Sequence, residues 1–116
     1  MSNLNIFKHS TDVVSFPAGH TIFSQGDQGD AMYVVKEGAV DIIVDDCVLE
    51  TVGEGGIFGE LALVDHEYRS ASAVTRSAST LVPVDGKRFE RLVAEAPFFA
   101  LNVISVLAGR LRRQTS

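Results

Sequence analysis

The hydrophobic pattern of this chain changes its period near residue 85, and this change is the strongest constraint on the fold. Eight of the ten glycines lie in the first sixty residues, and the apolar residues between them fall in short runs that alternate with polar ones. Val40, Ile42 and Val44 share one face of such a run, as in a half-buried strand. Strands are predicted at residues 13–16, 21–24, 32–35, 40–44, 48–52, 70–75 and 80–84. About eight short strands at this spacing predict a sandwich, a barrel or a jelly roll.

Two polar segments are predicted to turn the chain between neighbouring strands. Lys36-Glu37-Gly38 suits a hairpin between the third and fourth runs. Asp45-Asp46 starts the turn that follows the fourth run, because aspartate tolerates the backbone conformations that tight turns require. These segments predict that the middle strands are antiparallel neighbours.

Helical spacing replaces the alternation after Asp85, which is a suitable N-cap. The apolar face of this first helix consists of Phe89, Leu92, Val93 and Ala96. Pro97 breaks the helix and is well placed as the first residue of a second, which we expect over residues 97–113. The fold class is therefore mainly β, with helices at the C-terminal end.

The second helix has two apolar edges. One stripe consists of Phe98, Leu101, Ile104, Ala108 and Leu111, and the other edge of Phe99, Val103 and Val106. Three arginines, Arg110, Arg112 and Arg113, close its last turn, where cations complement the helix dipole. A helix that is apolar on two edges needs two neighbours. It either packs twice on its own barrel or forms a dimer seam, and we weigh these alternatives equally.

Length and composition narrow the class of protein. The 116 residues suit one domain, with a barrel over about 10–85 and helices over about 86–113. No apolar run approaches the roughly 20 residues of a membrane helix, and the first ten residues lack a signal-peptide core. Cys47 is the single cysteine, so an intrachain disulfide is impossible. We expect a soluble, cytoplasmic, single-domain protein with no membrane partner.

The net charge of −5 is unevenly distributed along the chain. Residues 1–86 carry four basic and thirteen acidic side chains, a net charge of −9, whereas residues 87–116 carry a net charge of +4. This balance disfavours direct binding of nucleic acid. Arg69 is the first cation after an acidic stretch over residues 37–67, which contains no Lys or Arg. Its position suggests a specific task.

Several catalytic and metal-binding patterns are incomplete. Residues 53–59 resemble a dinucleotide loop, but Phe58 occupies the third glycine position and no long helix pattern follows. The three histidines are scattered and give no metal-ligand set. Residues 26–30 lack most ligands of a calcium loop, and no serine lies in a GxSxG elbow. The sequence therefore predicts no enzyme, no catalytic residue and no metal or cofactor.

One segment favours a binding site for a small anion. Gly59 permits close approach of the backbone, and residues 60–63 are good formers of a short helical turn, whose free N–H groups attract anions. Arg69 adds a guanidinium that can bind a phosphate through two hydrogen bonds. The alternative is an internal salt bridge between Glu60 and Arg69, and the residues alone favour neither interpretation.

The same segment carries a resemblance to a known family. Residues 59–72, GELAL-x5-RSAS, resemble the phosphate-binding cassette of cyclic nucleotide-binding domains. Residues 17–27 and 32–40 are similar to the early strands and turns of that family, and the two terminal helices match as well. The resemblance covers roughly residues 10–113. It implies an eight-stranded β-barrel or jelly roll (a double-stranded β-helix) with a short cassette helix and C-terminal helices.

The resemblance also implies roles for individual residues. Arg69 would hold the equatorial phosphate oxygen, and Glu60 would accept a hydrogen bond from the ribose 2′-hydroxyl. Main-chain N–H groups would complete the site at Gly59, Glu60, Leu61, Ala62, Ser70 and Ala71. Ser70 stands where a hydroxyl is associated with cGMP in eukaryotic members, but bacterial members with serine there bind cAMP, so cAMP is favoured over cGMP. The base would be capped from residues 110–115.

The family mechanism implied for this chain is that of a sensor. Nucleotide binding would move the C-terminal helix about a hinge at residues 95–97 and so change contacts with a second copy or an effector protein. A stand-alone sensor is slightly favoured over a piece of a larger protein. One alternative is a degenerate, ligand-free interaction module that uses Phe99, Val103 and Val106 as its contact edge. A cyclic nucleotide hydrolase is another, without an identifiable base or metal site.

Overall fold

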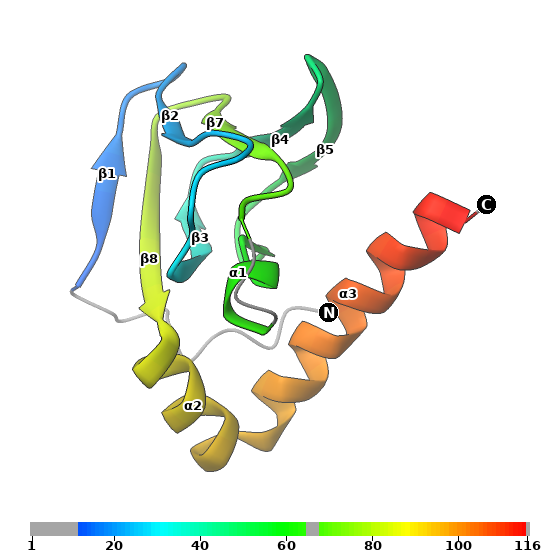
Figure 1. The fold of residues 1–116 in the computed structure, drawn as a ribbon. Coiled ribbons are helices and arrows are strands. Elements are labelled where there is room, and N and C mark those ends of the chain that lie inside the picture. Colours follow the sequence, from blue (N-terminus) through cyan, green and yellow to red (C-terminus); the bar gives the residue numbers. More distant parts are fainter. Residues whose placement is uncertain (1–11, 65–67, 116) are drawn as a thin grey trace.

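The computed structural model describes residues 12–64 and 68–115, which form two four-stranded antiparallel sheets followed by helices (Figure 1). The strands are β1 (Val14–Phe16), β2 (Thr21–Phe23), β3 (Ala31–Glu37), β4 (Val40–Val44), β5 (Cys47–Val52), β6 (Ile57–Phe58), β7 (Ser72–Thr75) and β8 (Ser79–Asp85). One sheet has the order β1-β8-β3-β6 and the other β2-β7-β4-β5. This is a jelly roll-like β-sandwich, which confirms the predicted fold class.

The predicted strands agree with those of the structure to within one residue at each end, apart from three differences. β3 continues to Glu37, two residues beyond its predicted end. β6 was not predicted, because its two residues lie in a glycine-rich segment too short to show any alternation. The strand expected from residue 70 begins at Ser72, so Arg69 lies in the connection before β7 rather than on the strand itself. From this connection the Arg69 side chain reaches β3, where it donates to Ala31 O.

Of the two predicted hairpins, the structure contains the one between β4 and β5. Asp45 and Asp46 both adopt positive φ, 49° and 67°, between β4 and β5, a pairing typical of tight two-residue hairpins. Gly38 has φ +94° between β3 and β4, and a side chain there would collide with Ser79 at 2.4 Å. The predicted hairpin between β4 and β5 is therefore confirmed. The predicted hairpin between β3 and β4 is wrong, because residues 36–37 still belong to β3 and the chain turns at Gly38 to cross from one sheet to the other.

Over residues 12–64 and 68–115, three helices accompany the sandwich: the first lies between β6 and β7, and the other two follow β8. They are the short α1 (Leu61–Val64), α2 (Gly86–Glu95) and α3 (Pro97–Thr115). Asp85 caps α2 by accepting a hydrogen bond from the Arg88 backbone N–H at 2.8 Å, as predicted. α2 continues from β8, and after a bend of 116° α3 runs back along the sandwich (Figure 1). Among the described residues no single helix is long and apolar enough to cross a membrane, whereas α2 and α3 reach that length and composition only together across the bend.

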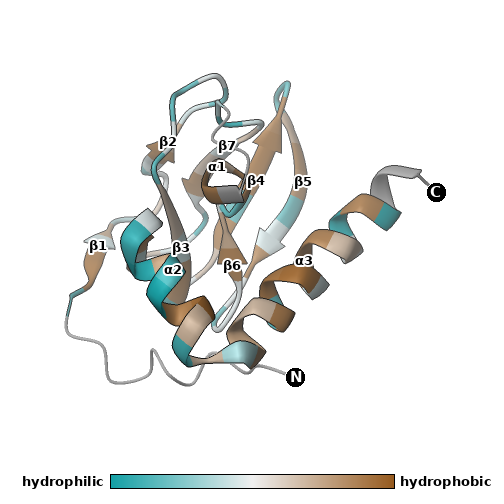
Figure 2. Ribbon diagram, turned by 60° about the horizontal axis from the view of Figure 1, so that its bottom comes forward, coloured by the Kyte–Doolittle hydropathy of each residue, from teal (hydrophilic) through white to brown (hydrophobic). Residues whose placement is uncertain are grey.

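The two apolar edges of α3 have different surroundings. Phe99 and Val103 are buried in a core cluster with residues of β3, β6 and β8, and Val106 packs against that cluster. The expectation that these three residues form a contact edge for another protein is therefore wrong, because they hold α3 to its own sandwich. The other stripe, Phe98, Leu101, Ile104, Ala108 and Leu111, is exposed. Hydrophobic residues extend along much of α3 (Figure 2).

Candidate functional site

The predicted cassette lies where β6 leads into α1. Gly59 follows β6 with φ +79°, a conformation that favours glycine. A side-chain carbon there would come within 2.8 Å of Arg69 Nη1, so the absence of a side chain lets the two segments meet. Leu63 N donates to Glu60 O at 3.0 Å, which closes the predicted helical turn. Gly59 thus brings the two ends of the cassette together.

Arg69 is buried, with 7% of its surface exposed, although it belongs to a connection. Its Nη1 donates to Gly59 O at 3.0 Å and its Nη2 to Ala31 O at 2.7 Å. Its Cζ lies 3.9 Å from the centroid of the Phe23 ring, and the guanidinium lies over the ring. Backbone hydrogen bonds between Arg69 and residues 26 and 27 hold this part of the chain in place. These contacts hold the side chain in one position.

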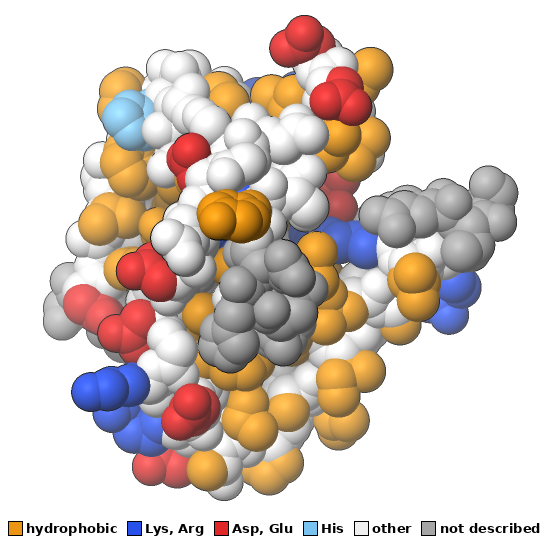
Figure 3. Space-filling model, in the orientation of Figure 1, with side chains coloured by type: hydrophobic (Ala, Val, Ile, Leu, Met, Phe, Trp, Pro, Cys, Tyr) orange, Lys and Arg blue, Asp and Glu red, His pale blue; other side chains and the backbone are white. Residues whose placement is uncertain are grey.

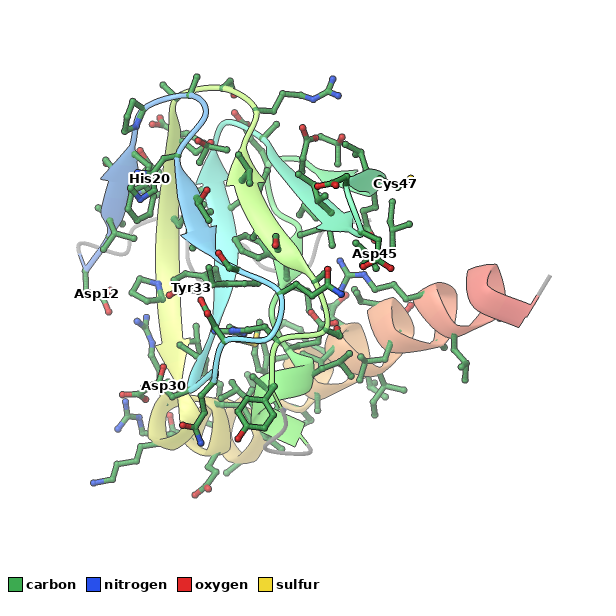
Figure 4. The ribbon with its side chains drawn as sticks, turned by 45° about the horizontal axis from the view of Figure 1, so that its top comes forward. Asp12, His20, Asp30, Tyr33, Asp45 and Cys47 are labelled. Carbon is green, nitrogen blue, oxygen red and sulfur yellow. The ribbon has the colours of Figure 1, made fainter. Side chains whose placement is uncertain are left out.

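The surroundings of Arg69 leave it a desolvated cation. Burial lowers the pKa of its guanidinium, while Tyr33 and the carboxylates of Asp30, Asp27 and Glu60 oppose this shift. Asp30 lies directly before β3, and Tyr33 lies on that strand (Figure 4). A guanidinium stays protonated in proteins even when burial removes part of its hydration. A nearby anion would stabilise such a cation, so Arg69 is expected to attract one.

Glu60 is also buried, with 2% of its surface exposed. Its Oε2 accepts a hydrogen bond from Arg110 Nη1 at 2.6 Å. The alternative of a Glu60–Arg69 salt bridge is therefore wrong, because Glu60 pairs with Arg110 and Arg69 donates to main-chain carbonyls. In the part of the chain that the structure describes, two buried side-chain polar atoms have no partner, Glu60 Oε1 and Arg69 Nε. Both belong to the predicted site.

Arg110 joins α3 to the cassette and was not predicted to do so. Its Nε and Nη2 donate to the two carboxylate oxygens of Glu50 at 2.9 and 3.0 Å, and Nη2 also donates to Ile57 O at 3.0 Å. Burial by itself lowers the pKa of Arg110, but the hydrogen bonds that it donates to Glu50 and the charge of Glu60 raise its pKa overall. Basic and acidic side chains meet where α3 approaches the sandwich (Figure 3). The sequence does contain a signal for this contact. Arg110 continues the helical spacing of Phe99, Val103 and Val106, which places it on the buried edge of α3.

The remaining predicted residues flank this centre. Ala62 is buried and Leu61 is exposed on α1, while Ser70 is exposed and Ala71 half-buried after Arg69. Residues 65–67, between the two halves of the cassette, lie outside the described residues. So do the side chains at 113–115, which include part of the predicted base cap.

Comparison with known proteins identifies the class. Residues 13–96 match the cyclic nucleotide-binding domain family, and the chain belongs to this family. It is 35% identical over 105 residues to a CRP-like cAMP-activated global transcriptional regulator of Mycobacterium tuberculosis, covering 86% of this chain and 47% of that protein. It is also 36% identical over 102 residues to the cyclic AMP receptor protein of Thermus thermophilus, covering 84% of this chain, and it spans about half the length of each of these two relatives.

Solved structures agree with this assignment. The catabolite activator protein of Thermus thermophilus superposes with a TM-score of 0.80 at 34% identity, over 89% of this chain and 51% of that one. The EAL enzyme Bd1971 superposes in its cGMP-bound and cAMP-bound forms with TM-scores of 0.68 and 0.67. Both comparisons with Bd1971 show 36% identity and cover 89% of this chain and 29% of the enzyme.

Proposed function

We propose that this chain binds a cyclic nucleotide through Arg69 and Glu60 and acts as a regulatory sensor. The observation that carries the proposal is the pair of buried atoms without partners, Arg69 Nε and Glu60 Oε1. A buried donor and a buried acceptor without partners are costly, so such atoms call for an explanation. A cyclic phosphate accepts from the first, and a ribose 2′-hydroxyl donates to the second.

The rest of the cassette completes the proposed site. Main-chain N–H groups of residues 59–62 and of Ser70 and Ala71 would donate to the phosphate oxygens. Gly59 supports this role because it has no side chain that would stand between the cassette and Arg69. A phosphodiester with a single negative charge complements the single charge of Arg69.

We favour cAMP over cGMP as the ligand. Two relatives at 35% and 36% identity are named for cAMP, the regulator of M. tuberculosis and the cyclic AMP receptor protein of T. thermophilus. Bd1971 was solved with either nucleotide, which shows that a related domain accepts both bases. Ser70 is consistent with either base, so the preference for cAMP rests on the relatives.

Signalling would proceed through α3. Arg110 reaches from this helix to Glu60 and Glu50, so a ligand that binds Glu60 can favour one position of the helix over another. A ligand shifts such an equilibrium only by its difference in affinity for the two positions. The protein would respond in the cytoplasm and would not turn over its ligand.

The exposed stripe of α3 would then take a partner helix. Leu101, Ile104, Ala108 and Leu111 follow one another at intervals of three, four and three residues, the spacing of a coiled-coil seam. Their exposure and their place on α3 make them the surface that a movement of this helix would present or withdraw (Figure 3). The partner is a second copy of the chain or an effector protein.

A calorimetric titration with cAMP, cGMP and 5′-AMP tests the proposal. We expect saturable binding of both cyclic nucleotides, tighter for cAMP, and much weaker binding of 5′-AMP, whose phosphate is not closed into a ring. Chromatography of the mixture should return unchanged nucleotide. The absence of binding at millimolar cAMP and cGMP would reject the proposal in favour of a ligand-free interaction module, and turnover would favour a hydrolase.

A further inference from the structure

The Arg69 guanidinium lies over an aromatic ring and forms no ion pair with a described carboxylate, although three carboxylates are near enough to act on its charge, those of Asp30, Asp27 and Glu60. Phe23 is the last residue of β2, and Arg69 Cζ is 3.9 Å from its ring centroid. The side-chain N–H groups that have partners donate to neutral carbonyls, Gly59 O and Ala31 O. A ring face attracts a cation within about 6 Å of its centroid, and the attraction increases as water is excluded.

The Phe23 ring is itself fixed by the core. Its centroid lies 6.3 Å from that of Tyr33 on β3 and 6.0 Å from that of Phe58 on β6, with both pairs tilted. Tyr33 and Phe58 stack on each other at 5.4 Å. Phe58 directly precedes Gly59, so the rings that orient Phe23 are continuous with the cassette.

Gly29 restricts the same guanidinium at another point. A side-chain carbon at Gly29 would lie 2.5 Å from Arg69 Nε and 2.6 Å from Cζ. Its φ is outside the left-handed region, so the backbone does not require glycine there. The requirement is one of space, because the loop between β2 and β3 packs directly against the guanidinium.

We propose that Phe23 and Gly29 are positioning residues, which fix the Arg69 guanidinium in one plane and keep its charge available to an anionic cyclic phosphate. This inference rests on the proposed function. A carboxylate at the position of Phe23 would neutralise Arg69 and compete with the phosphate for its N–H groups. The ring stabilises the cation without accepting any conventional hydrogen bond from Nε, which stays unpartnered.

Fluorinated phenylalanines test the role of the ring face. Site-specific replacement of Phe23 in the full chain by 4-fluoro- and then 3,4,5-trifluorophenylalanine withdraws electron density from the ring face and changes its size little. We expect the Kd for cAMP to rise stepwise, by about 2- to 30-fold in total. The unfolding temperature without nucleotide should fall as well, because the same contact stabilises the fold, whereas a packing role alone would leave the Kd unchanged.

Phe89 is the matched control. It packs edge-on against Phe99 at 5.8 Å, among the helices and away from Arg69, so the same fluorinated residues there should leave the Kd for cAMP unaltered. A flat Kd across the Phe23 series, with wild-type protein that binds cAMP, would overturn the role of the ring. A Kd that rises equally in the Phe89 series would overturn it as well.

Gly29→Ala tests the close approach, with Gly53→Ala as its control. A side-chain carbon at Gly53 meets nothing within 4 Å, and neither glycine is in the left-handed region. We expect Gly29→Ala to raise the Kd for cAMP at least tenfold and Gly53→Ala to leave it unchanged, with circular dichroism confirming that both are folded. Equal affinities would overturn the role of Gly29. Wild-type protein without affinity for cAMP or cGMP would instead reject the proposed function, so the two failures are distinguishable.

Discussion

Arg110 Nη1 of α3 lies 2.6 Å from Glu60 Oε2 of the cassette, and this ion pair joins the candidate site directly to the C-terminal helix. The same guanidinium holds Glu50 of β5 through both of that residue's carboxylate oxygens. Glu60 keeps Oε1 for a ligand while Arg110 occupies Oε2. Ligand and helix therefore share one carboxylate without competing for the same oxygen.

Arg110→Ala should destabilise the protein and weaken nucleotide binding. The substitution leaves the buried carboxylate of Glu60 without its cation, which we expect to lower the free energy of unfolding by about 3 kcal/mol, the lower end for a broken buried pair. Urea denaturation measures this loss, and calorimetry should show a raised Kd for cAMP because Glu60 is no longer held in place.

Arg76→Ala is the control for Arg110→Ala. Arg76 pairs with Asp41 on the surface, where its side chain is 60% exposed. Exposed ion pairs contribute little to stability, so we expect Arg76→Ala to lower the free energy of unfolding by less than about 1 kcal/mol. Equal losses of unfolding free energy in Arg110→Ala and Arg76→Ala would contradict a special role for the contact between Arg110 and Glu60.

Gly59→Ala should weaken binding of cAMP, an effect that backbone strain alone would not produce. Gly59 and Gly19 both have φ +79°, but a side chain at Gly59 meets Arg69 Nη1 at 2.8 Å whereas one at Gly19 meets nothing within 4 Å. Both alanine variants should lose about 1 kcal/mol of stability from strain. Only Gly59→Ala should raise the Kd for cAMP, and equal Kd values in the two variants would contradict the close approach to Arg69.

Glu60 should determine discrimination between ribose and deoxyribose. Wild-type protein should bind cAMP about ten- to a hundredfold more tightly than 2′-deoxy-cAMP, since the analogue leaves the buried Glu60 Oε1 without a donor. Glu60→Ala should bind the two nucleotides with similar affinity. Competition against a fluorescent cyclic nucleotide measures both ratios, and a preference that survives in Glu60→Ala would assign the 2′-hydroxyl to another residue.

Leu101→Glu should abolish association through α3. Leu101 is 66% exposed, so the substitution should leave the stability of the isolated chain nearly unchanged. We expect sedimentation equilibrium to show a concentration-dependent dimer for the wild type and a monomer for Leu101→Glu. Val93→Glu on α2 is the control and should dimerise normally. A wild type that stays monomeric at all concentrations would exclude a second copy as the partner.

Much of the fold was predictable because its signals are local. Alternation located most of the strands, Asp85 marked the start of α2, and Pro97 began α3 as expected. The cassette was predictable because its glycine, acid and arginine are close in sequence, and the structure brings Gly59 and Arg69 together. That the whole chain forms one domain stays a prediction.

The unpredicted features depend on contacts between distant segments. Phe23 looked like an ordinary strand residue, and only the sandwich places its ring against Arg69, 46 positions later. Arg110 looked like a cation at a helix end, but the helix turns back along the sandwich and brings it to Glu60. The two edges of α3 were equally apolar in sequence, and packing alone decided that the edge with Phe99 is buried.

The central claim is that Arg69 holds the phosphate of a cyclic nucleotide, and calorimetric titration of wild-type, Arg69→Ala and Arg69→Lys protein with cAMP tests it most directly. Circular dichroism would first confirm that each variant is folded, and Arg76→Ala would serve as the control for loss of a cation. Loss of a buried charge partner costs about 3–5 kcal/mol, so the Kd of Arg69→Ala should rise at least 100-fold, with Arg69→Lys in between. A folded Arg69→Ala protein that binds cAMP as tightly as the wild type would contradict the account.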